Sequence, residues 1–230
     1  MYRNFLKRVF DLFLSFLAIC VLSPLLLVLT VVGAFALKGN PFFTQKRPGK
    51  KNKNGQERIF KLIKFRTMTN EKDKDGNLLS DDKRLNSYGK FLRSTSLDEL
   101  PELFNILIGD MAIIGPRPQL VRDMVFMTEE QRHRHDVRPG LSGLAQVNGR
   151  NNITWEEKLF FDLEYIKNIT LFSDIKIIIW TVFKVFKREG INEEGMSTAL
   201  DFGDYLLAVK KITHEEYESK QKHAKELLKQ

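Results

Sequence analysis

The segment from Leu12 to Leu37 contains no charged residue, in a chain of 230 residues. As a continuous helix it would extend roughly 39 Å, more than a hydrocarbon core of about 30 Å. A buried helix of a soluble protein would show a polar stripe, and none is visible here. A cleaved signal peptide fits poorly, because the apolar run is too long. The segment therefore predicts a membrane-inserted helix.

Ser23 and Pro24 interrupt this apolar segment near its middle. Proline lacks a backbone N–H group and clashes with the preceding turn, so it kinks a helix. A serine hydroxyl can hydrogen-bond a carbonyl that the proline leaves free, which makes the break tolerable in lipid. The Ser-Pro pair therefore predicts a bend inside the apolar segment.

Basic residues lie on both sides of the apolar segment. Because basic flanks stay on the cytoplasmic side of a membrane, one straight pass cannot satisfy both. A kinked re-entrant hairpin, which enters and leaves through the same leaflet, satisfies both, whereas a spanning helix with a mild kink does not. Physical reasoning leaves both topologies open, because a mild kink in a spanning helix would also explain Pro24. The flanking residues are Arg3, Lys7 and Arg8 before the segment, and Lys38, Lys46, Arg47, Lys50, Lys51 and Lys53 after it.

The composition narrows the class of protein. With 43% hydrophobic residues the chain can bury a core, so global disorder is excluded. The single cysteine, Cys20, excludes a disulfide framework and a cysteine-based zinc site. The net charge of +8 favours a polyanionic partner, which could be nucleic acid, an anionic membrane surface or a phosphorylated substrate.

Beyond the apolar segment, the pattern predicts an α+β fold that is mostly helical. Phe42 to Gln45 and Ile59 to Phe65 are typical of strands, and Asn54-Gly55 between them predicts a β-hairpin. Four helix starts follow the capping-box pattern. They begin at Ser96, Thr128, Thr154 and Thr213.

The stretch from Ile175 to Arg188 predicts an amphipathic helix with a basic stripe and many aromatic and β-branched residues. Such a helix suits a membrane interface, and the alternative is a core helix with solvated lysines. From about Thr213 the chain is polar and charged, so we expect a solvated helix there.

The stretch from Arg93 to Pro118 reads RSTSLDELPELFNILIGDMAIIGPRP and concentrates the reactive side chains. Asp98 and Glu99 open a predicted helix, where one carboxylate could act as a nucleophile and the other could hold a metal. Arg93 and Arg117 could pair with phosphate oxygens. Helix capping alone could also explain both acids, with Glu99 completing the capping box of Ser96.

This string, with its LDEL-P and GPRP elements, resembles the bacterial sugar transferase family of monotopic phosphoglycosyl transferases, in particular its small PglC-like members. The resemblance covers residues 1–190. Further elements match in the same order. They are SP at Ser23, FFTQKRPG from Phe42, KFRTM from Lys64, VRPGLSGLAQVNGRN from Val137 and DLEYIKN from Asp162.

The resemblance implies transfer of a sugar 1-phosphate from a UDP-sugar to polyprenyl (undecaprenyl) phosphate, with release of UMP. It implies a covalent phosphosugar intermediate on Asp98, with Glu99 as a ligand of Mg²⁺. The remaining residues that it places in the site are Lys64, Arg93 and Arg117 at phosphate, Asn148 and Arg150 near the nucleotide or sugar, and Asp162 as an acidic member of the polar site.

The resemblance also favours the re-entrant hairpin over the span. We therefore expect a re-entrant membrane helix over residues 1–40, a cytoplasmic transferase domain over 41–199 and a polar helical tail over 200–230. The location implied is the bacterial inner membrane, with inner-membrane lipid as a partner. A tethered nucleic-acid-binding protein and a non-catalytic scaffold remain as alternatives, although no nucleic-acid motif is present. The UDP-sugar, the glycan pathway, the role of the tail and a homodimer are left open.

Overall fold

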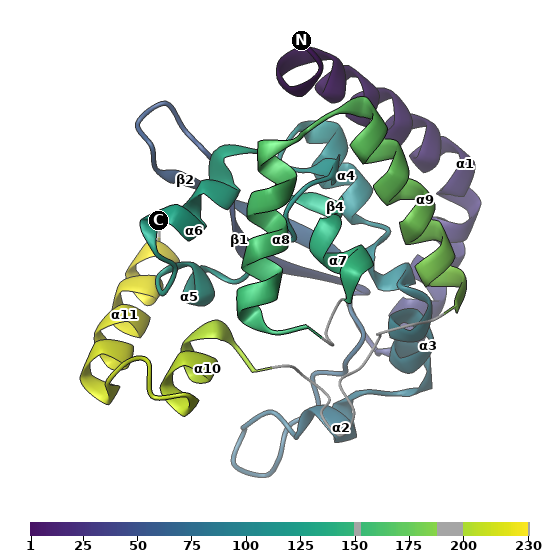
Figure 1. Ribbon diagram of the computed structural model, residues 1–230. Coiled ribbons are helices and arrows are strands. Elements are labelled where there is room, and N and C mark those ends of the chain that lie inside the picture. The colour runs from purple at the N-terminus through teal and green to yellow at the C-terminus, as the bar shows by residue number, and fades with distance from the viewer. Residues whose placement is uncertain (150–152, 188–199, 230) are drawn as a thin grey trace.

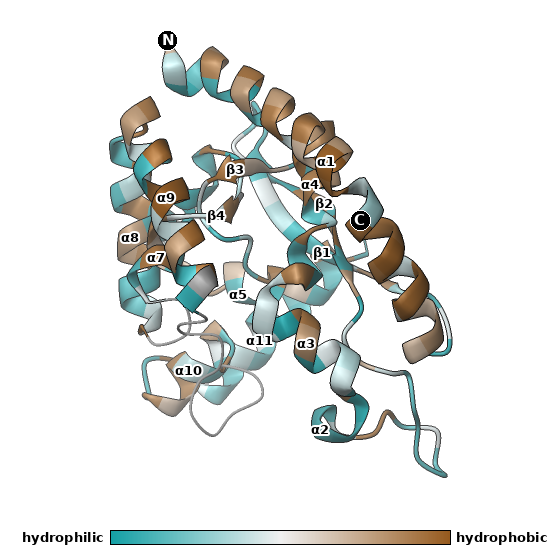
Figure 2. Cartoon of the chain, turned by 90° about the vertical axis from the view of Figure 1, so that its right-hand side faces the viewer, coloured by the Kyte–Doolittle hydropathy of each residue, from teal (hydrophilic) through white to brown (hydrophobic). Residues whose placement is uncertain are grey.

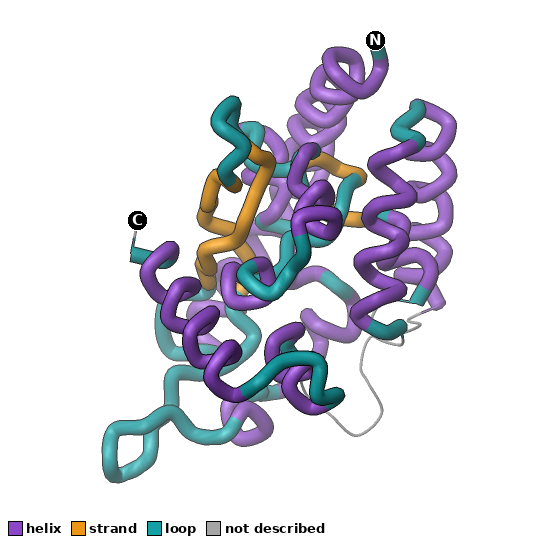
Figure 3. Tube along the Cα trace, turned by 60° about the vertical axis from the view of Figure 1, so that its left-hand side comes forward, coloured by secondary structure: helices purple, strands orange, loops and turns teal. Residues whose placement is uncertain are grey.

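The computed structural model describes residues 1–149, 153–187 and 200–229. In this part of the chain, a long N-terminal helix lies along one side of a body of shorter helices and two small sheets (Figure 1, Figure 3). The predicted α+β, mostly helical fold is confirmed. The helices are η1 (Tyr2–Leu6), α1 (Lys7–Ala36), α2 (Asp81–Arg84), α3 (Ser87–Thr95), η2 (Leu97–Glu99), α4 (Glu102–Ile108), α5 (Val121–Met124), α6 (Glu129–Arg132), η3 (His133–Asp136), α7 (Leu144–Asn148), α8 (Trp155–Lys167), α9 (Leu171–Lys187), α10 (Phe202–Ala208) and α11 (His214–Leu227). The strands are β1 (Phe42–Lys51), β2 (Glu57–Phe65), β3 (Ala112–Ile114) and β4 (Gly140–Ser142).

The apolar segment forms α1, a single helix that contains Pro24. The helix changes direction partway along its length (Figure 2). The hydroxyl of Ser23 donates a hydrogen bond of 2.9 Å to the carbonyl of Cys20, the group that would otherwise accept from the missing proline N–H. The Ser-Pro pair therefore bends the helix and satisfies the freed carbonyl, as the sequence predicted.

Both ends of α1 are bonded to the body of the protein. Near its start, Lys7 forms an ion pair of 2.6 Å with Asp174 at the beginning of α9. At its end, the Asn86 side chain donates a 2.9 Å hydrogen bond to the carbonyl of Ala36. The helix therefore lies along the body over its whole length.

The outward face of α1 is apolar and exposed. The helix from Tyr2 to Ala36 is long and apolar enough to cross a membrane, and only 17% of its most apolar window is buried. Helix α9 has a similar outward stripe, in which Phe172 is 78% exposed and Phe183 62% exposed. This stripe favours the interfacial interpretation of α9 over a core helix. Arg188, the last residue of the predicted helix, lies outside the described residues.

The predicted β-hairpin is confirmed. Strands β1 and β2 pair antiparallel, with Phe42 opposite Phe65 and Lys51 opposite Glu57. Strand β1 extends six residues beyond the predicted Phe42–Gln45, because the pairing continues through an irregularity between Pro48 and Lys51. Lys64 thereby lies next to the end of β2.

A second sheet, of two parallel strands, was not predicted from the sequence. Strands β3 and β4 pair Ala112 with Gly140 and Ile114 with Ser142. A Cβ atom on Gly140 would lie 2.1 Å from the backbone nitrogen of Gly115, so this position requires glycine. Three-residue strands carry too little alternation to be recognised in the sequence.

Three of the predicted helix caps are present and one is not. The side chains of Thr128, Thr154 and Thr213 accept hydrogen bonds from backbone N–H groups three residues later. The predicted cap at Ser96 is wrong, because Ser96 has a φ of 57° and makes no side-chain cap bond. Its left-handed backbone ends α3 and separates the Asp98 turn from that helix.

The helix predicted to open at Asp98 instead begins at Glu102. Asp98 and Glu99 lie in the one-turn helix η2, and Pro101 is the N-cap residue of α4. Proline cannot donate a backbone hydrogen bond, which accounts for the break between the two helices.

The C-terminal segment packs on the body. In α10, Phe202 is 3% exposed and belongs to the same apolar cluster as Trp155. Helix α11 is mostly exposed, as expected for a solvated helix, but Ala224 is buried against Val121 of α5. The described residues after 200 are thus continuous with the core.

Candidate active site

Three separate elements bring charged side chains together at one site. Lys64 comes from the end of β2, Asp98 and Glu99 from η2, and Arg117 from the loop that follows β3. These residues were all selected from the sequence, and the structure brings them together. The hairpin and α4 are fixed relative to each other by Asn105 of α4, which accepts from the Ile63 N–H at 2.9 Å and donates to the Lys61 carbonyl at 2.8 Å.

Glu99 lies between two cations. Its Oε1 atom is 2.8 Å from the Lys64 ammonium and 2.7 Å from the Arg117 guanidinium. Burial would raise the pKa of Glu99, but Arg117 and Lys64 outweigh burial and hold that pKa well below its usual range. In turn, Glu99 raises the pKa of Arg117. Glu99 is therefore ionised, and one of its two oxygens is held in place.

Asp98 is different, although it is the next residue. Within the described residues, its carboxylate makes no hydrogen bond or ion pair. Burial and the neighbouring charge of Glu99 raise the pKa of Asp98 to about 6, against the opposing effects of Lys64, Arg117 and Arg93. An unpaired carboxylate with a raised pKa is more basic and more nucleophilic than an ordinary aspartate. It is still largely ionised at pH 7.

Glu102, which the sequence analysis did not select, is a third carboxylate in the site. It is only 2% exposed, and its Oε1 atom lies 3.0 Å from the Lys64 ammonium. Burial raises the pKa of Glu102 to about 7, with a further contribution from Glu99. Its position one residue after Pro101 makes it look like an ordinary first-turn acid, which hides its role from sequence reasoning.

Arg93 approaches the same site from α3. Its Nε atom donates a 3.1 Å hydrogen bond to the Thr67 hydroxyl, and its charge lowers the pKa of Asp98. Helix α3 lies close to the backbone here, because a Cβ atom on Gly89 would lie 1.8 Å from the Thr67 carbonyl oxygen. Gly89 therefore allows the contact that places Arg93 beside Asp98.

Arg47 of β1 is a second residue that the sequence analysis did not place in the site. It donates hydrogen bonds to the Pro118 carbonyl at 3.2 Å and to Gln45 at 2.7 Å, while its buried Nε has no partner among the described residues. Burial and the nearby charge of Arg117 lower the pKa of Arg47 to about 10. The signal was present, because Arg47 belongs to the FFTQKRPG element of the resemblance.

Asp162 lies behind the site. Its Oδ2 atom accepts two hydrogen bonds from Arg134, at 2.9 and 2.6 Å, and both side chains are almost fully buried. Arg134 also donates a 2.6 Å hydrogen bond to the backbone carbonyl of Arg117. Asp162 therefore acts through Arg134 on the loop that carries Arg117, and the structure does not place its carboxylate beside Asp98.

The NGRN element is described only in part. Asn148 ends α7, is exposed, and donates a 2.8 Å hydrogen bond to the carbonyl of Leu144. The structure does not bring Asn148 into contact with the carboxylates of the site. Arg150 lies outside the described residues, so its predicted role near the nucleotide or sugar stays a prediction.

The donor set is compatible with Mg²⁺. Among the described residues, no group of three or more His, Cys, Asp or Glu side chains forms a metal cage. Mg²⁺ normally uses one or two protein carboxylates and takes its other ligands from water and substrate phosphates. The second oxygen of Glu99 has no partner in the described part of the chain, and Asp98 is unpaired. These two carboxylates could hold such an ion next to a bound diphosphate.

The chain is similar to known proteins over most of its length. The family described as bacterial sugar transferase matches residues 2–188. The sugar transferase EpsL of Bacillus subtilis, which is described as uncharacterized, is 44% identical over 197 residues, covering 86% of this chain and 95% of EpsL. A UDP-glucose:undecaprenyl-phosphate glucose-1-phosphate transferase of Klebsiella pneumoniae is 40% identical over 190 residues. The undecaprenyl-phosphate galactose phosphotransferase of Salmonella typhimurium is 35% identical over 209 residues.

The relatives with named substrates are longer proteins. The matches cover 78% of this chain but 40% of the Klebsiella protein, and 81% of this chain but 42% of the Salmonella protein. The similarity thus concerns about two-fifths of each of those proteins, whereas it extends over nearly all of EpsL.

Proposed function

The chain belongs to the bacterial sugar transferase family, and from this premise we propose that it transfers a sugar 1-phosphate from a UDP-sugar to polyprenyl (undecaprenyl) phosphate. The name of the Klebsiella relative specifies UDP-glucose as the donor and undecaprenyl phosphate as the acceptor. The name of the Salmonella relative specifies undecaprenyl phosphate and galactose. The products are a polyprenyl diphosphate sugar and UMP. The observation that carries the proposal is the unpaired Asp98 beside a Glu99 that two cations hold in place.

In the first step, an Asp98 oxygen attacks the phosphorus that bears the sugar. A bond forms between that oxygen and phosphorus, the bond from phosphorus to the UMP oxygen breaks, and UMP leaves with the electron pair. In the second step, an oxygen of polyprenyl phosphate attacks the same phosphorus and the Asp98 carboxylate is released. Splitting the transfer in this way allows the water-soluble and the lipid substrate to react in turn.

The surrounding charges have separate tasks in this scheme. Arg117, whose side chain is 43% exposed, is accessible to a diphosphate and can form paired hydrogen bonds with its oxygens. Lys64 forms ion pairs with two carboxylates and offsets part of the negative charge of the site before substrate binds. Mg²⁺, held by Glu99 and Asp98, would neutralise diphosphate charge and stabilise the leaving UMP.

The test is release of UMP by the detergent-solubilised chain across a panel of UDP-sugars. We expect more than one UMP per protein molecule only when a UDP-sugar, undecaprenyl phosphate and Mg²⁺ are all present, because each further turnover requires the lipid phosphate to free Asp98. One UDP-sugar should give the highest kcat/KM. Repeated turnover, with many UMP released per protein molecule in the absence of the lipid phosphate, would contradict the transfer reaction. No release with any UDP-sugar would favour the scaffold alternative.

We further propose that α1 is re-entrant, with both ends at the cytoplasmic face of the inner membrane. Two bonds support this topology, because Lys7 pairs with Asp174 near one end and Asn86 binds Ala36 at the other. The 30 residues of α1 extend about 45 Å, so a span would separate these partners by the full hydrocarbon core. Asp174 and Asn86 belong to the same polar body, which cannot lie on both sides of a bilayer.

Cysteine labelling in intact cells tests this topology. In a Cys20→Ala background, single cysteines are introduced by Asn4→Cys and Gly39→Cys, with Lys74→Cys in an exposed loop as the internal reference. We expect all three to resist a membrane-impermeant reagent and to react after permeabilisation. Reaction of either end of α1 from outside the cell, with the Lys74→Cys variant still protected, would contradict the re-entrant topology.

A further inference from the structure

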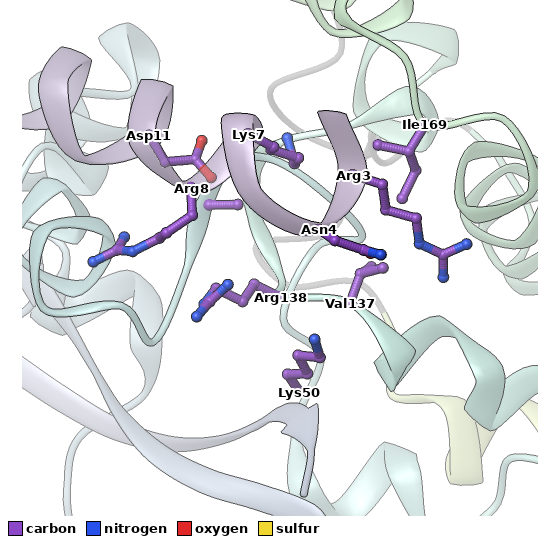
Figure 4. A pocket seen from close by; sticks show the side chains of 10 residues that line it. Arg3, Asn4, Lys7, Arg8, Asp11, Lys50, Val137, Arg138 and Ile169 are labelled. Atoms are coloured by element: carbon purple, nitrogen blue, oxygen red, sulfur yellow. The ribbon is translucent and has the colours of Figure 1, made fainter. Parts of the chain in front are cut away.

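A cavity of about 190 Å³ lies between the first turns of the N-terminal helix and the body of the protein (Figure 4). It shares no lining residue with the candidate active site. It is large enough for a small polar headgroup, since an engineered cavity of about 150 Å³ holds a benzene molecule. The lining residues are Arg3, Asn4, Lys7, Arg8, Asp11, Lys50, Ala112, Val137, Arg138 and Ile169.

The lining is strongly basic, and part of its charge is already paired. Lys7 forms its ion pair with Asp174. Arg8 donates to the carbonyls of Ile106 and Leu107, at 2.6 and 2.9 Å, so its donors are used within the protein. The acidic member of the lining, Asp11, already accepts a 3.0 Å hydrogen bond from a backbone N–H.

Three other cations of the lining form no ion pair with any residue that the structure describes. Arg3 and Lys50 make no hydrogen bond or ion pair with any described residue. Arg138 uses its Nε atom to donate a 2.7 Å hydrogen bond to the Gly109 carbonyl, which leaves its two terminal nitrogens. Figure 4 shows the Lys50 side chain directed toward the N-terminal helix, with the guanidinium groups of Arg138 and Arg3 on opposite sides of it.

The electrostatic environment of the cavity favours an anion. Burial and the nearby charge of Arg8 lower the pKa of Arg138, against the opposing effects of Asp11 and Asp110. Like charges that crowd a partly buried cavity are stabilised when an anion enters it. Two guanidinium groups and one ammonium group are the side chains that match phosphate oxygens best.

The surroundings of the cavity are apolar. On the N-terminal helix, Phe5 is 63% exposed and Phe10 is 41% exposed, and Phe172 at the start of α9 is 78% exposed. The two helices meet at the Lys7–Asp174 ion pair, next to the cavity. A molecule with a phosphate group in the cavity could therefore lay an apolar portion along these side chains.

We propose that this cavity is a phosphate-binding site, separate from the active site, in which Arg3, Lys50 and Arg138 hold the phosphate group. The phosphate can belong to a membrane phospholipid or to a soluble phosphate ester. The apolar surroundings favour the phospholipid. Its bound headgroup would fasten the start of the N-terminal helix to the loop that carries Arg138.

Thermal unfolding of the full chain in detergent, followed by the fluorescence of Trp155 and Trp180, tests the proposal. Three probes are titrated. They are short-chain phosphatidylglycerol, glycerol 3-phosphate and a diacylglycerol of the same chain length, which lacks the phosphate. The test variant is Arg3→Gln with Lys50→Gln. The matched control is Lys53→Gln with Lys74→Gln, which removes the same charge from exposed positions outside the cavity.

We expect phosphatidylglycerol to raise the unfolding temperature of the parent and the control in a saturable way. The apparent affinity of the Arg3→Gln, Lys50→Gln variant should be about tenfold weaker, because two charge-assisted contacts are lost. Lys50→Arg should retain binding, since the charge is kept. UMP release should be similar in all variants, so this test is independent of the proposed reaction.

The three probes separate the sources of the phosphate. Binding of phosphatidylglycerol with weaker binding of glycerol 3-phosphate identifies a lipid phosphate, and equal binding identifies a soluble one. An equal stabilisation by diacylglycerol would overturn the proposal, because the phosphate would then contribute nothing. So would an equal response of the test variant and the control, because the effect would then come from general charge.

Discussion

The cluster around Glu99 and a second cluster around Glu57 use similar side chains but balance their charges differently. Glu57 of β2 accepts a 2.8 Å hydrogen bond from Arg132 and lies 3.2 Å from the Nδ1 atom of His135. Burial would raise the pKa of Glu57, but His135 and Arg132 outweigh burial and hold it well below its usual range. In this cluster one carboxylate contacts two basic side chains, so its negative charge is compensated.

The Glu99 cluster has the opposite balance. Of its three carboxylates, Glu99 contacts both Lys64 and Arg117, Glu102 contacts Lys64, and Asp98 contacts neither. Asp98 and Glu102 are left with a raised pKa. Both clusters are buried and ion-paired, so these two properties alone do not identify a reactive site. The distinguishing property is negative charge that the protein leaves uncompensated, ready for a substrate or a cation.

The largest expected effect comes from Asp98→Asn. This change removes the proposed nucleophile, and we expect UMP release to fall by at least about 10³-fold. The unfolding temperature should be unchanged or higher, because repulsion from Glu99 is relieved. The control is Asp75→Asn, at an exposed loop position. Near-normal turnover of the Asp98→Asn variant would contradict the proposal that Asp98 is the nucleophile.

Glu57→Gln should have the opposite effect, a loss of stability with little change in activity. It removes the charge of a carboxylate that is only 3% exposed and weakens its hydrogen bonds to Arg132, which keeps only the longer contact of 3.7 Å with Glu129. This should cost about 2 kcal/mol in the free energy of unfolding. The kcat/KM of the folded protein should stay close to that of the parent. Thermal unfolding and UMP release are measured together, with Glu71→Gln as an exposed control. A selective loss of kcat without loss of stability would remove the distinction between the two clusters.

Arg117→Lys tests the cation that contacts Glu99 and is accessible to substrate. Lysine keeps the charge but loses the paired donors of the guanidinium, so we expect kcat/KM to fall about tenfold. Arg58→Lys is the control, at a side chain that is 71% exposed. An Arg117→Lys variant with unchanged kinetics would show that this guanidinium does not contact the diphosphate.

The smallest effect concerns pH. Burial lowers the pKa of His135 from 6.5 to about 4, with a further contribution from Arg134. Between these values the unfolded chain binds a proton that the folded protein does not, so stability is lost as the pH falls from 6.5 towards 4. His135→Gln should flatten this part of the curve of unfolding temperature against pH, whereas the exposed His223→Gln should not. Parallel curves for parent and His135→Gln would refute the linkage.

The parts of the fold that the sequence predicts are those with local signals. The bend at Pro24, the hairpin turn at Asn54-Gly55 and the threonine caps each depend on a few adjacent residues. The Ser96 cap was misassigned because its pattern is local, whereas its left-handed backbone is set by the packing of α3 and η2. The parallel β3–β4 pair joins distant residues, and no local pattern could reveal it.

For the candidate site too, local signals were predicted from the sequence and contacts between distant residues were not. Asp98, Glu99, Lys64 and Arg117 were found because they lie in recognisable elements, but their proximity joins three separate parts of the chain and is seen only in the structure. Glu102 was missed because a first-turn acid has an ordinary explanation in the helix dipole. The support of Arg117 by Arg134 was missed because a contact to a backbone carbonyl leaves no trace in side-chain patterns.

The attachment of α1 at both ends has a mechanical consequence in the membrane location that we propose. A helix with free ends meets a thicker or thinner bilayer by tilting alone. Here Lys7 and Ala36 are bonded to the same body, so any tilt of the helix tilts the body with it. Bilayer thickness would therefore set the height of Asp98 relative to the lipid headgroups. The reaction rate should then depend on acyl-chain length through geometry, apart from any chemical preference for a lipid.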